Sequence, residues 1–138
     1  MIQLSNPILF LTGLWVALYR DHMGIVRISI LCSLLHELEH VMVWVFLKRS
    51  MPELVLSPIG IGLSIYDAHF SSRQELVLAA AGPLVNFVLA IISWGILSYH
   101  ASYWGYFFMG ANLLISLFNL LPVGCLDGKR IWKNLLNK

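Results

Sequence analysis

The chain has 138 residues, of which 59% are hydrophobic and only 12% are charged, and its formal net charge is +2. A soluble domain has about twice that charged fraction, so the composition indicates a membrane protein, and the length indicates a single domain over residues 1–138. The small net charge, without a basic patch interleaved with aromatic residues, excludes nucleic-acid binding as the expected function.

Four apolar segments approach the roughly 20 residues that a membrane-spanning helix needs. They cover residues 2–19, 28–47, 76–98 and 103–121. The first segment has neither the basic start nor the small-residue cleavage site of a signal peptide, so we expect it to be a retained span. Residues 76–126 contain no Asp, Glu, Lys or Arg, which disfavours a soluble fold. We therefore predict an all-α polytopic membrane protein with about four transmembrane helices.

The connection between the second and third predicted spans differs from the others. Residues 54–66 are apolar and partly β-branched, and Pro58, Gly60 and Gly62 interrupt them. The segment is too short and too broken for a spanning helix, so we expect a β-hairpin or a re-entrant segment. Such backbone persists at membrane depth only where protein or a water-filled cavity covers it.

Basic residues predict the orientation of the spans. If the N-terminus is cytoplasmic, residues 48–75 and the C-terminal tail, with a short interfacial helix expected at 128–136, are cytoplasmic too. These two segments contain Lys48, Arg49, Arg73, Lys129, Arg130, Lys133 and Lys138. The opposite side contains only Arg20 and Arg27. This asymmetry is the positive-inside bias of an integral membrane protein.

The second predicted span contains the sequence His36-Glu37-Leu38-Glu39-His40. Residues four apart lie on the same face of a helix, so the two imidazoles stand one turn apart beside a glutamate. This H-E-x-x-H pattern is typical of metalloproteases, in which the histidines bind zinc and the glutamate acts as general base. Ionisable groups inside an apolar span are costly and generally mark a functional site. The alternative is a chance match whose polar side chains pair with their neighbours.

A catalytic zinc site needs a third protein ligand and one open position for water. Asp127 is the best candidate, because Pro122 and Gly124 would break the preceding helix and free the backbone to aim this side chain inward. The alternative role of Asp127 is to cap the C-terminal helix, and the two roles are compatible. Cys125 is the next candidate for the third ligand.

Three motifs together resemble the site-2 protease family of intramembrane zinc metalloproteases. They are H-E-L-E-H in the second span, Gly82-Pro83-Leu84-Val85-Asn86 early in the third, and N-L-L-P-x-x-x-L-D-G after the fourth. The resemblance covers residues 28–130. The single span before the first motif, without an inserted PDZ-type domain, resembles the branch of stage IV sporulation protein FB. The chain departs from the family at Glu39 and Lys129, where glycine is frequent.

The resemblance implies the roles of individual residues. It implies Glu37 as the catalytic base and a zinc ion held by His36, His40 and Asp127. It also implies substrate contacts from Asn119, Gly60, Ile61, Gly62 and Leu63. A strand near the zinc could pair with an unwound substrate by β-augmentation, whereas Asn119 has the alternative role of capping a broken helix.

The activity implied by the resemblance is regulated intramembrane proteolysis. The enzyme would hydrolyse peptide bonds in or near transmembrane segments of membrane-associated proteins. It would lie in the lipid bilayer of a bacterial cytoplasmic membrane, with its active site nearer the cytoplasmic face and with a regulatory membrane protein as a further partner. The chain stops at Lys138, before the later spans of the sporulation branch, as either a minimal core or part of a longer protein.

The amino-acid sequence alone is compatible with two other functions. A catalytically inactive membrane scaffold would retain the same zinc site for stability. A divalent-metal transporter fits less well, because an ion path should place ionisable residues on several spans. Residues 76–126 contain only His100 of this kind.

Overall fold

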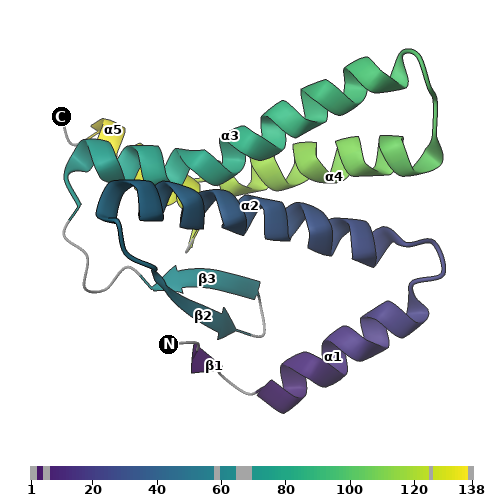
Figure 1. The fold of residues 1–138 in the computed structure, drawn as a ribbon, viewed down its shortest axis with the longest axis horizontal. Coiled ribbons are helices and arrows are strands. Elements are labelled where there is room, and N and C mark those ends of the chain that lie inside the picture. The colour runs from purple at the N-terminus through teal and green to yellow at the C-terminus, as the bar shows by residue number, and fades with distance from the viewer. Residues whose placement is uncertain (1–2, 5–6, 58–59, 65–69, 125, 137–138) are drawn as a thin grey trace.

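The computed structural model describes residues 3–4, 7–57, 60–64, 70–124 and 126–136, which form five helices and three short strands (Figure 1). The helices are α1 (Pro7–Arg20), α2 (Ile25–Lys48), α3 (Ser72–Leu97), α4 (Tyr103–Asn119) and α5 (Asp127–Leu136). The strands are β1 (Gln3–Leu4), β2 (Glu53–Ser57) and β3 (Gly60–Ser64). Helices α1 to α4 thus occupy the four apolar segments of the sequence, and α5 covers residues 128–136, where a short helix was predicted. Its place at the membrane interface stays a prediction.

Two of these helices, α2 and α3, are long and apolar enough to cross a membrane, by length and composition, within the described residues. The 14 residues of α1 and the 17 of α4 give rods of about 21 and 26 Å, shorter than a hydrocarbon layer of about 30 Å. The count of four spans therefore stays a prediction. Large apolar side chains such as Phe46, Trp94 and Phe118 are 84%, 67% and 62% exposed, which suits a lipid environment better than water.

The core of the molecule forms where α2, α3 and α4 pack against one another (Figure 1). Along each helix, a series of buried residues recurs at every fourth position. The series are Cys32, His36, His40 and Trp44 on α2, Leu78, Gly82, Asn86 and Ala90 on α3, and Asn112 and Ser116 on α4, and α3 also buries Ala79, Pro83 and Leu97. Residues four apart form a ridge along a helix, so the three helices meet along such ridges. The two histidines of the motif therefore lie in the centre of the packed helices.

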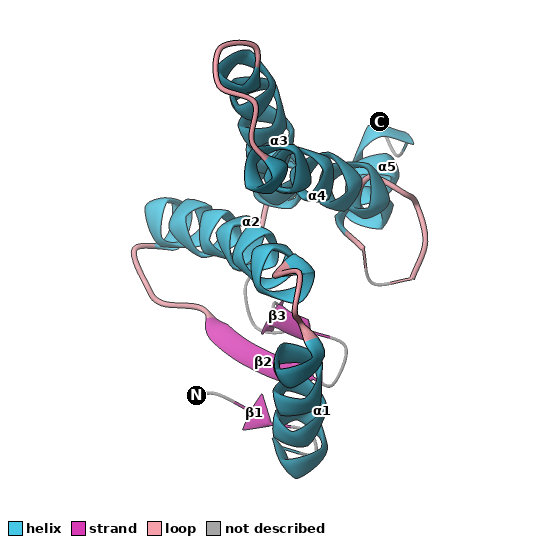
Figure 2. Ribbon diagram, turned by 90° about the vertical axis from the view of Figure 1, so that its right-hand side faces the viewer, coloured by secondary structure: helices cyan, strands magenta, loops and turns pink. Residues whose placement is uncertain are grey.

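The strands form a small sheet in the order β1-β2-β3, on the side of α2 that faces away from α3 and α4 (Figures 1 and 2). β2 and β3 are antiparallel, with Glu53 opposite Ser64 and Ser57 opposite Gly60. Residues 54–57 and 60–64 of the segment expected as a hairpin or re-entrant piece are therefore extended. Residues 58–59 and 65–66 of that segment lie outside the described residues. β3 also lies against α2.

The predicted start of the first span, at Ile2, is wrong. Gln3 and Leu4 form β1, which pairs in parallel with β2, and the helix begins only at Pro7. Proline suits the first position of a helix, because the N–H that it lacks would have no partner inside the helix. A strand of two residues is too short to show any periodicity in the sequence, so the sequence did not separate it from the helix.

At the starts of two helices, polar side chains accept hydrogen bonds from backbone N–H groups of the first turn, and both helices begin before the predicted spans. α3 begins at Ser72, four residues before the predicted span, because Ser71 and Gln74 form a capping box. The turn before α2 contains Asp21, which is only 7% exposed. Its carboxylate accepts a hydrogen bond from the backbone N–H of Arg27 at 3.0 Å, within the first turn of α2.

Candidate metal centre

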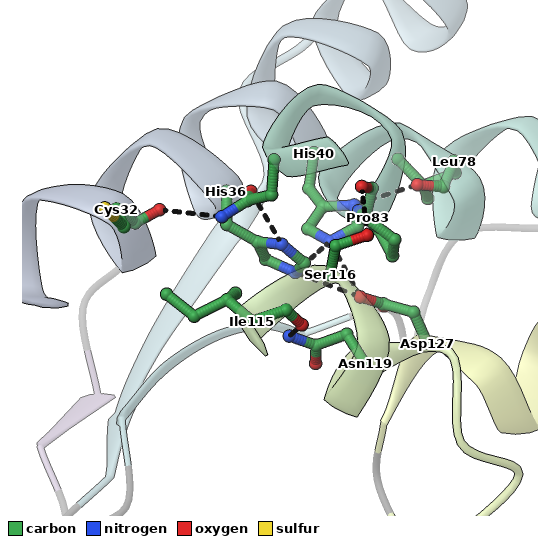
Figure 3. Close-up of polar contacts among 10 residues, drawn as sticks. Cys32, His36, His40, Leu78, Pro83, Ile115, Ser116, Asn119 and Asp127 are labelled. Carbon is green, nitrogen blue, oxygen red and sulfur yellow. Dashed lines mark hydrogen bonds and ion pairs between the residues drawn. The ribbon is translucent and has the colours of Figure 1, made fainter. Parts of the chain in front are cut away.

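Three side chains from two helices converge on one buried point (Figure 3). Nε2 of His36 and Nε2 of His40 each lie 3.1 Å from Oδ2 of Asp127, and the two Nε2 atoms lie 3.2 Å apart. The side chains of His36, His40 and Asp127 are 5%, 6% and 13% exposed. Among the described residues, these three form the group of His, Cys, Asp and Glu side chains that could hold a metal ion.

The spacing of these three atoms fits a tetrahedral zinc ion. Zinc binds histidine nitrogen and carboxylate oxygen at about 2.0–2.2 Å, which places neighbouring ligand atoms of a tetrahedron about 3.3–3.6 Å apart. The observed separations of 3.1, 3.1 and 3.2 Å are slightly shorter. Only a small outward movement of the side chains is needed to admit the ion, and three ligands leave the fourth position open.

The backbone of α3 sets the tautomer of His40. Its Nδ1 lies 2.8 Å from the carbonyl oxygen of Leu78, which is buried (Figure 3). A carbonyl oxygen only accepts hydrogen bonds, so Nδ1 of His40 must donate, and Nε2 then presents its lone pair. A metal-binding histidine commonly has such a partner on its other ring nitrogen.

The position of Asp127 depends on close packing between α5 and the end of α4. A Cβ atom at the next residue, Gly128, would overlap the backbone of Leu120 and Leu121. Glycine therefore allows the first turn of α5 to approach the chain that leaves α4. Burial raises the pKa of Asp127, but hydrogen bonds that His36 and His40 donate in their protonated forms lower it to about 2. The carboxylate is thus held in the charged form that a metal ligand requires.

Glu37 lies on α2 beside this group and is half-buried. Its carboxylate lies within electrostatic range of His40, His36, Asp127 and Arg130 of α5. Glu37 is not among the three converging ligands. Its position next to the metal group, with its carboxylate uncommitted there, is compatible with a role as a base.

Gly82 of α3 lies directly against both imidazoles. The sequence motifs did not predict that this glycine contacts the metal group. A Cβ atom here would lie 2.5 Å from Nε2 of His40 and 2.7 Å from Nε2 of His36. The bare backbone of α3 therefore forms one wall of the metal group. The feature of the sequence that could have indicated this role is the spacing of Leu78, Gly82 and Asn86. Residues four apart place this glycine and this asparagine on one face of an apolar helix.

We expect Gly82→Ala to lower zinc affinity by at least about 10-fold, the lower limit of the effect seen when the surroundings of a metal ligand are disturbed. The added methyl group would displace an imidazole or push α3 away from α2. Gly95→Ala in the same helix is the matched control, because its Cβ would meet no atom within 4 Å. Competition with a chelator of known affinity measures both variants. Equal zinc affinity for the two would contradict a role for Gly82 in the metal group.

The remaining predicted site residues do not belong to the group of His36, His40 and Asp127 that the structure describes. Asn119 is the last residue of α4, and its Nδ2 donates to the carbonyl of Ile115 at 3.0 Å, within its own helix (Figure 3). Residues 60–63 lie in β3, beside α2, with only their backbone described. Cys125, the alternative third ligand, lies outside the described residues. The structure thus brings together the two histidines and Asp127, and leaves the substrate contacts as predictions.

A buried group of two histidines on an apolar helix, an aspartate and an adjacent glutamate is typical of membrane-embedded zinc hydrolases. No protein-family model matches the chain. The solved structure of a site-2 protease from Methanocaldococcus jannaschii matches it with a TM-score of 0.70 and 26% identity, over 99% of this chain and 67% of that one.

Curated relatives agree with this match. Stage IV sporulation protein FB of Bacillus subtilis is 29% identical over 133 residues, which are 91% of this chain and 46% of that protein. A zinc metalloprotease of Methanocaldococcus jannaschii is 32% identical over 109 residues, which are 75% of this chain and 32% of that protein. The chain belongs to the site-2 protease family. It spans less than half of the length of either curated relative.

Proposed function

We propose that the chain is an intramembrane zinc metalloprotease that hydrolyses peptide bonds in or near transmembrane segments of membrane-associated proteins. The observation that supports this function best is the convergence of His36, His40 and Asp127 beside Glu37, among apolar helices. The three converging residues would hold the metal. When bound, zinc acts as a Lewis acid on the scissile carbonyl and makes a water molecule more acidic.

Glu37 is the proposed general base. It would take a proton from the attacking water and later deliver a proton to the leaving amine. Asp127, already ionised, would offset the positive charge of the metal. The surrounding apolar helices would exclude bulk water, which strengthens each of these electrostatic contacts.

Strand β3 is the proposed docking edge for the substrate. β2 lies between β1 and β3, so one edge of β3 is unpaired in the sheet of described strands. An extended substrate could add to that edge through main-chain hydrogen bonds, beside the helix that contains Glu37. Residues Gly60, Ile61, Gly62 and Leu63 would then contact the substrate, and Asn119 would contact it from the end of α4.

The proposed orientation places the metal group nearer the cytoplasmic face of a bacterial membrane. Figure 1 shows the end of α2, the start of α3 and helix α5 at one end of the molecule. Lys48, Arg73 and Lys129 belong to these parts of the chain. Basic residues gathered at one end favour the cytoplasmic side. A regulatory membrane protein is a further proposed partner.

The test of this function uses purified protein and a panel of reporters, each with one transmembrane segment, in the same lipid vesicles. We expect cleavage that stops when a strong zinc chelator is added and returns when zinc is restored, since zinc supplies the Lewis acid. Stoichiometric zinc without cleavage of any reporter would instead support an inactive scaffold. Zinc flux across the vesicle membrane would support a transporter.

A further inference from the structure

The imidazole of His36 has a partner on the side that faces away from Asp127. Oδ1 of Asn86, on α3, lies 3.3 Å from Nδ1 of His36. Asn86 is 0% exposed and lies within an apolar helix. A buried amide is unfavourable unless its polar atoms have partners, so the partners of Asn86 determine how its side chain is held.

The second contact of Asn86 settles the orientation of its amide group. Its Nδ2 lies 3.4 Å from the carbonyl oxygen of Cys32, one turn before His36 on α2. A carbonyl oxygen only accepts hydrogen bonds, so the amide nitrogen must face Cys32 and the amide oxygen must face His36. The reversed amide would bring two oxygen acceptors together at Cys32, which is unfavourable.

This orientation also settles the tautomer of His36. The amide oxygen of Asn86 is an acceptor, so Nδ1 of His36 must carry the hydrogen. A neutral imidazole has one such hydrogen, and Nε2 of His36 therefore presents a lone pair toward Asp127. With the opposite tautomer, Nε2 would carry a hydrogen and could not bind a metal.

Helix α3 thus orients both histidines in the same sense, His40 through the carbonyl of Leu78 and His36 through Asn86. The two Nε2 lone pairs then meet at 3.2 Å, close to the carboxylate of Asp127. Three acceptors at this distance repel one another unless a cation lies between them. The hydrogen bonds to the two Nδ1 atoms therefore preorganise the group for a cation, although Asn86 and Leu78 would not bind the cation themselves.

We propose that Asn86 is a positioning residue, which fixes the tautomer and ring orientation of His36 and thereby raises the zinc affinity of the metal group. This inference rests on the metal group of the proposed function. It concerns zinc binding and not cleavage, so it holds equally for a protease and for an inactive scaffold.

The test compares two buried asparagines in purified, full-chain protein. Asn86→Leu removes both polar contacts of Asn86 at similar volume. Asn112→Leu is the matched control, because Asn112 is also 0% exposed, but its Nδ2 donates to Sγ of Cys32 at 3.2 Å and to the carbonyl of Phe108 at 2.9 Å instead of contacting an imidazole. We expect zinc affinity, measured by chelator competition, to fall about 10–100-fold for Asn86→Leu and less than about threefold for Asn112→Leu.

A conservative variant and a spectroscopic readout separate positioning from a general loss of packing. Asn86→Asp keeps the acceptor oxygen that faces His36, although it loses the donor to the carbonyl of Cys32 unless its carboxyl group is protonated, so we expect its zinc affinity to lie between those of Asn86→Leu and the parent. The ¹⁵N NMR spectrum of labelled histidine in metal-free protein, at a pH where imidazole is neutral, reports which ring nitrogen carries hydrogen. His36, assigned by its loss in His36→Gln, should be the Nδ1–H form in the parent and a tautomer mixture in Asn86→Leu.

Several results would overturn the role of Asn86. Zinc affinity equal to that of the parent in Asn86→Leu, or an equal loss in Asn112→Leu, would show that the amide only packs. An unchanged His36 tautomer in Asn86→Leu would have the same meaning. Zinc binding without cleavage would refute the proposed protease function while the role of Asn86 stands. If the parent binds no zinc, the metal group itself fails and the proposal fails with it.

Discussion

Replacing Glu37 by glutamine should reduce cleavage of a membrane-anchored reporter by about 10²–10⁴-fold, the usual contribution of a general base. Glutamine keeps the shape and hydrogen bonding of glutamate but cannot accept a proton at neutral pH. Because Glu37 is not one of the three converging ligands, zinc should stay bound at about one ion per chain. Cleavage in lipid vesicles and zinc content by elemental analysis measure the two effects separately.

The matched control for this variant is Glu39→Gln. Glu39 lies on the same helix, is half-buried like Glu37, and receives the same chemical change. It does not belong to the metal group, so we expect its cleavage rate to stay within about threefold of the parent, the range of an ordinary surface change. Parent-like cleavage by Glu37→Gln would remove Glu37 from the mechanism. Loss of zinc in that variant would make Glu37 part of the metal site instead.

Replacing Asp127 by alanine should abolish tight zinc binding and cleavage together. Its Oδ2 lies 3.1 Å from Nε2 of both His36 and His40, so the variant loses one of three ligand atoms. Loss of a hydrogen-bond partner of a metal ligand lowers metal affinity by about 10–100-fold. Loss of the ligand itself should therefore lower zinc affinity by more than about 100-fold. Zinc affinity, measured by chelator competition, and the rate of reporter cleavage should therefore fall in parallel.

Asp21→Ala is the control for this second variant, because Asp21 is also a buried aspartate but bonds the backbone of Arg27 in the first turn of α2. It should lower thermal stability, through the lost N-terminal contact, while zinc affinity stays near that of the parent. Full zinc occupancy in Asp127→Ala would place the third ligand elsewhere, and Cys125 would be the next residue to replace.

The sequence by itself determined the parts of the site that depend on local geometry. His36 and His40 are four residues apart in an apolar segment, and helix periodicity alone brings their imidazoles to one face. The apolar segments likewise located helices α1 to α4, because burial or lipid contact requires such stretches. The capping box of Ser71 and Gln74 was not predicted, because a criterion based only on hydropathy excludes a polar first turn.

Only the tertiary structure decided how the site is completed. Asp127 meets His36 across 91 positions of the chain, and no local pattern specifies such a contact. The contributions of α3 are a backbone carbonyl at Leu78, a missing Cβ at Gly82 and the amide of Asn86, whose effects exist only once α3 packs against α2. β1 is likewise too short for any periodicity and is defined by its pairing with β2. The sequence therefore supplied the candidate ligands, with Asp127 preferred over Cys125, whereas their meeting and their orientation required the packed helices.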